Sequence, residues 1–500
     1  MSASRRREFL HRALCLTAGS AAFGSMLGKL ELAQAAVPKG TGRTLEGADY
    51  RALVCIYLYG GNDCFNMLVP SDAGYSVYQA TRTNLAIPQN QLLSLNLVSP
   101  PQGGGSFGLH PQMTGLRSMF NDQRNVAFVA NVGPLVRPVN KTLYQQPGTL
   151  LPPQLFSHSD QTLVWQTPRA DTAQRTGWGG RLADIFAATN PNQVLSMNVS
   201  LDGDNVFQAG VNVLPYFMSR EGVEEISMVQ TGAPNCADGG NGWNRRRCLS
   251  FNALLNQSYS HPFERAYVQK TRATMETSAQ VKAAIALYPA NDVLFRPFWD
   301  AHGLAWNPTN LPELPPLAAQ LLMIARVIRA RGNLQMLRQL FFAGLGGFDT
   351  HDNQLTDHPA LLRDLSQSIK AFYDVLANPA MNLANRVTTF TASEFGRTLT
   401  NNGDGTDHGW GGHHIVVGGR VDGGKIYGRM PSLAASNNPD DAGWGQIIPT
   451  LSVDQYAATL ARWYGLSDGD RDTIFPNLQF MTGSIPSIQG PNLGFMLAPV

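Results

Sequence analysis

Five short apolar runs constrain the fold of this chain more than any other feature of its sequence. They lie at residues 52–59, 126–132, 194–199, 337–343 and 387–392, and glycine or polar clusters end them. Uninterrupted hydrophobicity of this length is typical of strands that are buried on both faces. The runs therefore predict a sheet that is covered by other structure on both sides.

Helical spacing separates these runs, and the alternation predicts an α/β fold with a doubly wound, mostly parallel sheet. Segments with that spacing lie at 110–121, 180–188, 317–331, 359–376 and 453–464. Ser452 is a suitable N-cap for the last of them. The polar stretch 202–315 interrupts the alternation, so we expect an insertion or cap within one α/β domain over residues 36–500.

Composition excludes several classes of protein. Charged residues make up 15% of the 500 and hydrophobic residues 43%, which excludes intrinsic disorder and a coiled coil. The formal net charge of +2 gives no support for a nucleic-acid partner, which requires a strong basic excess.

Residues 1–35 have the pattern of an export signal. Arg5, Arg6 and Arg7 precede a mildly apolar run, and Ala33-Gln34-Ala35 supplies a small-x-small cleavage pattern. The core Arg-Arg-x-Phe-Leu resembles a twin-arginine signal, with an ordinary secretory signal or a membrane anchor as alternatives. The apolar run is short and rich in glycine, so we expect no stable membrane span. Without these residues the net charge is −1.

Four cysteines follow the signal, and an oxidising compartment would allow them to pair. Cys236 and Cys248 flank a loop rich in glycine and asparagine and are the expected pair, whereas Cys55 lies inside an apolar run. No spacing typical of a thiolate zinc site is present.

Acids and histidines follow the apolar runs at the points where open α/β sheets bind their ligands. Carboxylate and imidazole groups suit zinc, manganese or iron, and the supply is large enough for two ions. Each motif alone has a simpler explanation, such as a turn, a helix cap or an ion pair between Glu394 and Arg397. Together they predict a metal site. The candidate ligands are Asp63, Asp349, His351, Glu394, Asp407, His408, His413 and His414.

Four motifs in this order, at 59–63, 347–351, 393–398 and 407–409, together with the export signal, resemble a known family. It is the twin-arginine-exported bacterial family called domain of unknown function 1501, in the alkaline phosphatase and sulfatase superfamily. The resemblance implies an alkaline-phosphatase-like α/β fold and export to the periplasm or beyond.

The resemblance also implies roles for the candidate ligands. Asp63 would contact metal at the end of the first strand, Asp349 and His351 would serve one ion, and Asp407 and His408 another. His413 or His414 would complete a site. One residue separates Asp349 from His351, whereas the phosphatase pattern has three between its acid and histidine, and His358 is an alternative partner.

The nucleophile has the weakest sequence signal. Superfamily hydrolases attack with a hydroxyl or modified cysteine at a helix N-terminus, and Ser157 and Ser159 precede a helical pattern. A helix cap and a structural histidine, His158, would explain the same segment. The sulfatase pattern Cys-x-Pro-x-Arg is absent.

These patterns predict an exported, metal-dependent hydrolase of phosphate or sulfate esters, in which Arg397 orients the anion. Its partners would be a small or polymeric ester substrate and, during export, the twin-arginine translocase. The alternative is a non-catalytic exported scaffold or glycan-binding protein that retains the fold.

Overall fold

A computed structural model of the chain describes residues 49–172, 175–192, 195–223, 242–307, 309, 313–481 and 490–498. The export signal and Cys236 lie outside these residues. The chain divides into two compact units, Met1–Arg43 with Glu225–Thr277 and Thr44–Glu224 with Ser278–Val500.

The described part of the first unit, residues 242–277, is a pair of helices. Helix α9 (Gly242–Asn256) is followed by α10 (Pro262–Ala286), as the polar helical pattern there predicts. Arg272 in α10 donates a hydrogen bond of 2.7 Å to the carbonyl oxygen of Leu255 in α9. The described part of this unit lies within the expected insertion 202–315, whose boundaries remain a prediction.

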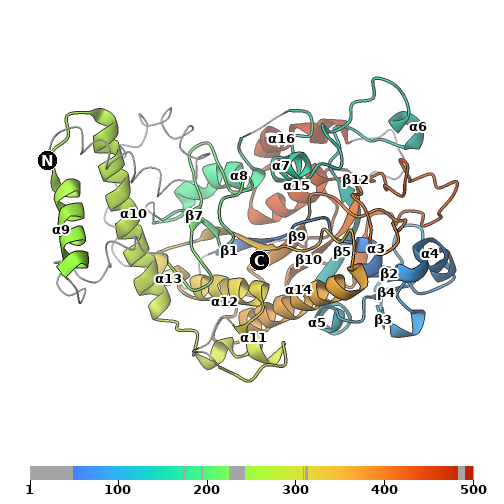
Figure 1. Cartoon of the computed structure of the whole chain (residues 1–500), viewed down its shortest axis with the longest axis horizontal. Helices are drawn as coiled ribbons and strands as arrows, with labels where there is room; N and C mark the ends of the chain where they lie inside the picture. The colour runs from blue at the N-terminus through green and yellow to red at the C-terminus, as the bar shows by residue number, and fades with distance from the viewer. Residues whose placement is uncertain are drawn as a thin grey trace. The chain divides into compact units, whose positions relative to one another are not determined.

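The second unit is built on a nine-stranded, mixed sheet with the order β11-β5-β10-β9-β1-β8-β6-β7, and β12 also pairs with β5 (Figure 1). Among the described strands of this sheet β10 alone runs antiparallel to its neighbours, so the α/β class and the mostly parallel sheet are confirmed. The strands are β1 (Arg51–Leu58), β5 (Val126–Gly133), β6 (Asn198–Ser200), β7 (Tyr216–Phe217), β8 (Arg338–Leu345), β9 (Val387–Ala392), β10 (Gly412–Gly418), β11 (Lys425–Tyr427) and β12 (Leu451–Ser452).

Helices cover both faces of this sheet. Alternate residues of β1 point to opposite faces: Ala52 and Val54 join a core with α12 and α14, whereas Leu53 and Cys55 join a core with α8 and α15. A strand that contributes apolar side chains to two cores has an uninterrupted hydrophobic sequence, which is the pattern that predicts it. Figure 1 shows these two helical layers on either side of the sheet.

Apart from the helices that cover the large sheet, the other elements of this unit are short. A small sheet contains β2 (Leu68–Pro70), β3 (Leu93–Ser94) and β4 (Phe107–Leu109). The helices of the second unit are α3 (Cys64–Met67), α4 (Gly74–Arg82), α5 (Thr114–Ser118), α6 (Lys141–Tyr144), α7 (His158–Gln166), α8 (Trp178–Phe186), α11 (Pro297–Asp300), α12 (Pro316–Arg329), α13 (Arg331–Leu334), α14 (Gln354–Ala377), α15 (Val453–Tyr464) and α16 (Asp468–Ile474).

Local sequence signals account for where helices begin. Ser452 caps α15 as predicted, because its hydroxyl accepts from the N–H of Gln455 and the Gln455 side chain accepts from the N–H of Ser452. Helix α14 begins five residues before its predicted start, so Pro359 lies inside the helix rather than at its first position. The fixed φ of proline suits a helix, and its missing N–H removes one hydrogen bond. In the described residues no helix is long and apolar enough to cross a membrane.

Candidate metal centre

The carboxyl ends of β9, β1 and β8, three adjacent parallel strands, bring the acid and histidine motifs together. The turn after β1 contains Gly60, the segment after β8 contains Asp349, and Glu394 follows β9 closely. Gly60 has φ +113°, and a Cβ at that position would lie 2.2 Å from the backbone nitrogen of Asp349. Only glycine allows the first strand to end so close to Asp349.

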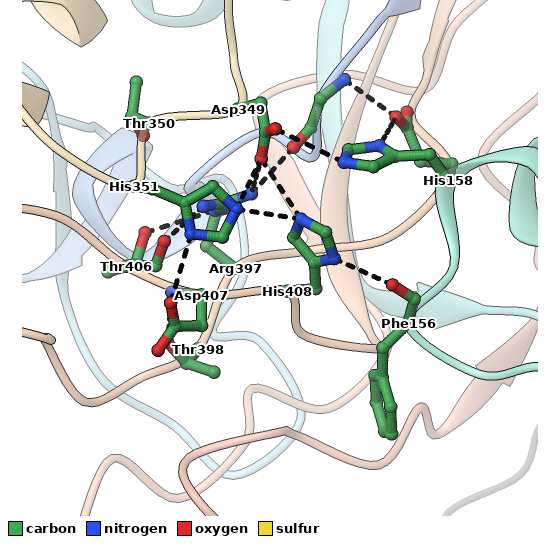
Figure 2. A network of polar contacts seen from close by, with 12 residues as sticks. Phe156, His158, Asp349, Thr350, His351, Arg397, Thr398, Thr406, Asp407 and His408 are labelled. Atoms are coloured by element: carbon green, nitrogen blue, oxygen red, sulfur yellow. Dashed lines mark hydrogen bonds and ion pairs between the residues drawn. The ribbon is translucent and has the colours of Figure 1, made fainter.

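Three histidines surround the carboxylate of Asp349 (Figure 2). Its Oδ1 lies 3.1 Å from Nε2 of His351 and 3.2 Å from Nε2 of His408, and its Oδ2 lies 3.3 Å from Nε2 of His158. The Nε2 atoms of His351 and His408 are 3.0 Å apart. His158, Asp349 and His408 are the one group among the described residues that meets the geometric requirement for holding a metal ion.

The other ring nitrogen of each histidine faces a hydrogen-bond acceptor. Nδ1 of His408 is 2.7 Å from the carbonyl oxygen of Phe156, and Nδ1 of His351 is 3.1 Å from Asp407. Nδ1 of His158 is 2.9 Å from Oε1 of Glu394. A carbonyl or carboxylate oxygen can only accept, so each Nδ1 donates, and the Nε2 of a ring that is neutral presents its lone pair to Asp349.

When these rings are neutral, the two Nε2 atoms and Oδ1 of Asp349 are acceptors that face one another, and Arg397 is the donor to Oδ1 from the buried side. The three mutual distances among Nε2 of His351, Nε2 of His408 and Oδ1 of Asp349 are 3.0–3.2 Å. Ligand atoms of a tetrahedral zinc, at bond lengths of about 2.0–2.1 Å, are separated by about 3.3 Å. Histidines that ligate metal also donate their second nitrogen to a carbonyl or carboxylate. The donor set therefore fits a divalent cation.

The pKa shifts differ between the histidines. Burial lowers the pKa of His408, which favours a neutral ring, whereas the hydrogen bond to Glu394 raises the pKa of His158, which favours its protonated form. Burial alone would raise the pKa of Asp349, but the hydrogen bond and the charge of Arg397 outweigh it and lower that pKa. Asp349 is therefore a carboxylate at neutral pH.

A buried layer supports the exposed ligands. The side chains of Asp349 and His351 are 43% exposed, whereas Arg397 is fully buried and Glu394 almost so. Arg397 donates to Asp349 at 2.6 Å, to the carbonyl oxygen of Gly60 at 2.9 Å, and to the carbonyl oxygen of Thr406. Because its guanidinium is occupied beneath Asp349, we assign Arg397 to positioning that carboxylate rather than to contact with substrate.

Three predicted ligands lie apart from this group of contacts. Asp63, fully buried, pairs with Arg82 and accepts from Gln354. His413 accepts from the N–H of Asn131 at 3.0 Å, and its ring packs edge-on to Phe65. His414 packs between Trp165 and Tyr456. Both histidines belong to β10, and burial lowers the pKa of His413 to about 4 and of His414 to about 3.

The two candidate nucleophiles stand at the start of α7. Ser157 lies between Phe156 and His158, both of which belong to the site, and its hydroxyl donates to Asp160 at 2.6 Å. The hydroxyl of Ser159 is 3.3 Å from that of Ser157. Phe156 has φ +72°, a strained conformation for a bulky residue, and this directs its carbonyl to His408.

Sequence reasoning missed His158 as a member of the group. The sequence offered a structural role for this histidine as one of two open interpretations of the segment, because its position at the start of a helix does not show which strand ends the helix faces. Its place between Ser157 and Ser159, in a segment already associated with catalysis, was the available signal.

Comparison with known proteins identifies a family without an assigned activity. No curated protein matches the chain significantly. Residues 50–459 match the family model described as "Protein of unknown function (DUF1501)", and this range contains every residue of the site described above. The match covers most of the chain, which therefore belongs to the DUF1501 family.

Proposed function

We propose that this protein is an exported, metal-dependent hydrolase of phosphate or sulfate esters with an alkaline-phosphatase-like fold. The observation that carries the proposal is the convergence of the Nε2 atoms of three histidines on the carboxylate of Asp349, an arrangement of nitrogen and oxygen atoms that a cation would stabilise. The export signal that the sequence predicts would take the chain to the periplasm or outside the cell.

The residues present supply ligands for one ion and the beginning of a second site. Asp349, His158 and His408 would hold the first ion, and His351, whose Nε2 lies 3.0 Å from that of His408, would face the second. Zinc, manganese and iron all accept this set of nitrogen and oxygen ligands. A bound divalent ion would polarise an ester oxygen and stabilise negative charge in the transition state.

The remaining groups have roles that follow from their contacts. Arg397 and Glu394 hold Asp349 and His158 in place from the buried side. Ser157, Ser159 or a water molecule would attack the ester. Ser157 is the favoured group, because Asp160 at 2.6 Å can accept its proton.

Substitution His408→Ala tests the proposal, because it removes a ligand whose ring is partly exposed and whose loss leaves the sheet intact. We expect turnover of an aryl phosphate and aryl sulfate panel to fall roughly 100-fold or more. The wild type should lose activity on chelation and regain it with zinc, manganese or iron. His261→Ala is the matched control, since His261 is exposed and outside this site, and it should leave the rate unchanged.

Equal turnover by wild type and His408→Ala would contradict the enzyme proposal. Absence of turnover in the metal-loaded wild type, combined with binding to carbohydrate arrays that survives His408→Ala, would favour the non-catalytic glycan-binding alternative.

A further inference from the structure

Trp444 is the most exposed large hydrophobic side chain among the described residues, with 89% of its surface accessible. Its backbone has φ +60°, in the left-handed region that a bulky side chain rarely occupies. Strained residues of this kind persist where the surrounding structure holds them, and they gather at functional sites. An exposed indole on a strained backbone points to a functional role for Trp444.

The turn that carries Trp444 is closed by hydrogen bonds. Asp441 and Ile447 form a β-bridge, and the N–H of Ala442 donates to the carbonyl oxygen of Gln446 at 2.9 Å. The N–H of Gln446 donates back to the carbonyl oxygen of Gly443 at 3.0 Å. The ring is therefore presented by an ordered turn, which lowers the entropy that a ligand must remove on binding.

The same turn is attached to the candidate metal centre at two points. The Thr400 hydroxyl donates to the carbonyl oxygen of Trp444 at 2.9 Å, and the Gln446 side chain donates to the carbonyl oxygen of His408 at 3.1 Å. Gly445, at φ +81°, packs so closely that a Cβ there would lie 2.7 Å from the nitrogen of Thr400. Gln446 is two residues from Trp444, a backbone length of at most about 7 Å.

The exposed ring has no exposed large hydrophobic residue close to it in the sequence. Among the described residues, the nearest ones along the chain are Leu355 and Phe480. A protein or membrane docking face would need a contiguous apolar patch of several hundred square ångströms. The loop that adjoins the turn contains polar residues, including Asn401 and Asn402. One flat apolar ring with polar neighbours suits a ligand of similar size that is polar at its edge.

We propose that Trp444 stacks against a pyranose ring, and that the substrates are phosphate or sulfate esters of sugars. The C–H face of a sugar ring matches the indole face, and its hydroxyl groups match the polar surroundings. The ester group would extend toward His351 and His408. This inference rests on the proposed function for its ester specificity, but stacking of the sugar itself does not depend on turnover.

Steady-state kinetics of Trp444→Ala test the inference. With glucose 6-phosphate and N-acetylglucosamine 6-sulfate, we expect KM to rise roughly tenfold and kcat to change little, because stacking is made equally in ground and transition states. With ethyl phosphate and ethyl sulfate, neither constant should change. Trp444→Phe should retain most of the affinity. Trp306→Ala is the matched control, because Trp306 is also exposed and contacts Arg296 in another part of the fold.

Calorimetric titration with methyl glucopyranoside separates failure of this inference from failure of the proposed function. Binding that Trp444→Ala removes would support stacking even if no ester is hydrolysed. Three results would overturn the inference: unchanged sugar binding in Trp444→Ala, an equal rise in KM for sugar and ethyl esters, or a change of oligomeric state that identifies the ring as an interface with a second copy.

Discussion

Lowering the pH from 7 to 5 is expected to reduce the free energy of unfolding by several kcal/mol, because the fold buries five neutral histidines. Burial lowers the pKa to about 4 for His110, His302, His358 and His413, and to about 3 for His414. The unfolded chain binds protons at these residues with a pKa near 6.5. Stability is therefore fully present above about pH 6.5 and is lost as the pH falls toward 4.

The expected loss is large compared with the stability of a typical domain. At pH 5, which lies about 1.5 units below the unfolded pKa, each histidine costs about 2 kcal/mol. The summed loss from five histidines is comparable to the whole free energy of unfolding of a typical domain, roughly 5–15 kcal/mol. Asp454 acts in the opposite direction, because burial raises its pKa to about 8 and its protonation favours the fold. Asp202, Asp364 and His158, whose pKa values are also raised, act in the same direction as Asp454, and we expect the five buried histidines to outweigh these groups.

Urea unfolding at pH 7, 6 and 5 measures this loss directly. His414→Phe provides a comparison, since a phenyl ring can occupy the space between Trp165 and Tyr456 without binding a proton. This variant should lose less stability than the wild type over the same range, by about 2 kcal/mol at pH 5. Stability that is independent of pH between 7 and 5 would show that these histidines are not neutral in the fold.

Substitution Asp63→Ala is expected to lower the free energy of unfolding by about 3–5 kcal/mol, because it leaves the guanidinium of Arg82 buried without a counter-ion. Both side chains are fully buried, and Gln354 also donates to this carboxylate. The sequence suggested a metal ligand at this position. The contacts of Asp63 instead favour a structural role in joining α4 to the turn after β1.

Equilibrium unfolding and metal analysis of the same variant distinguish the two roles. Asp422→Ala is the matched control, since Asp422 pairs with Lys425 at the surface and should contribute about 0–1 kcal/mol. If Asp63→Ala kept wild-type stability but lost bound metal, Asp63 would be a ligand and our account of the buried pair would be wrong.

The sequence predicted those parts of the fold where local pattern and burial agree. The run 387–392 is β9, the run 126–132 is one residue shorter than β5, and the run 52–59 is shifted by one residue from β1. Strands buried on both faces are continuous apolar runs, and this pattern identifies them in the sequence. The run 194–199 was placed too early, because β6 begins only at Asn198, a polar residue whose amide is buried among loop contacts.

Strand β10 was not predicted, because its two histidines suggested metal ligands rather than a strand. His413 and His414 were interpreted as ligands in a loop, although Ile415, Val416 and Val417 continue a β-prone run. The side chains of the two histidines point to opposite faces of the sheet, as neighbours in a strand must, so they cannot both reach one ion. Antiparallel pairing puts the start of β10 beside the carboxyl ends of β5 and β9, and both histidines are buried there by tertiary packing that the local sequence does not encode.

The candidate site could be predicted only in part, because some of its contacts follow from the positions of strand ends and others depend on tertiary packing. Asp349, His351 and His408 follow strands that proved to be neighbours or lie in the adjoining loop, so a rule about strand ends was sufficient to group them. His158 approaches from α7 across many intervening residues, and its contact with Asp349 depends on how that helix packs. The buried position of Arg397 likewise depends on the packing of Gly60 and Thr406 around it.

The metal content of the wild-type protein, isolated after export and in metal-replete medium, tests the central claim most directly. Elemental analysis by mass spectrometry should find about one or two equivalents of zinc, manganese or iron per chain, and His408→Ala should reduce this several-fold. Less than about half an equivalent of any transition metal in the wild type would contradict the account, because the three histidines around Asp349 would then not serve as metal ligands.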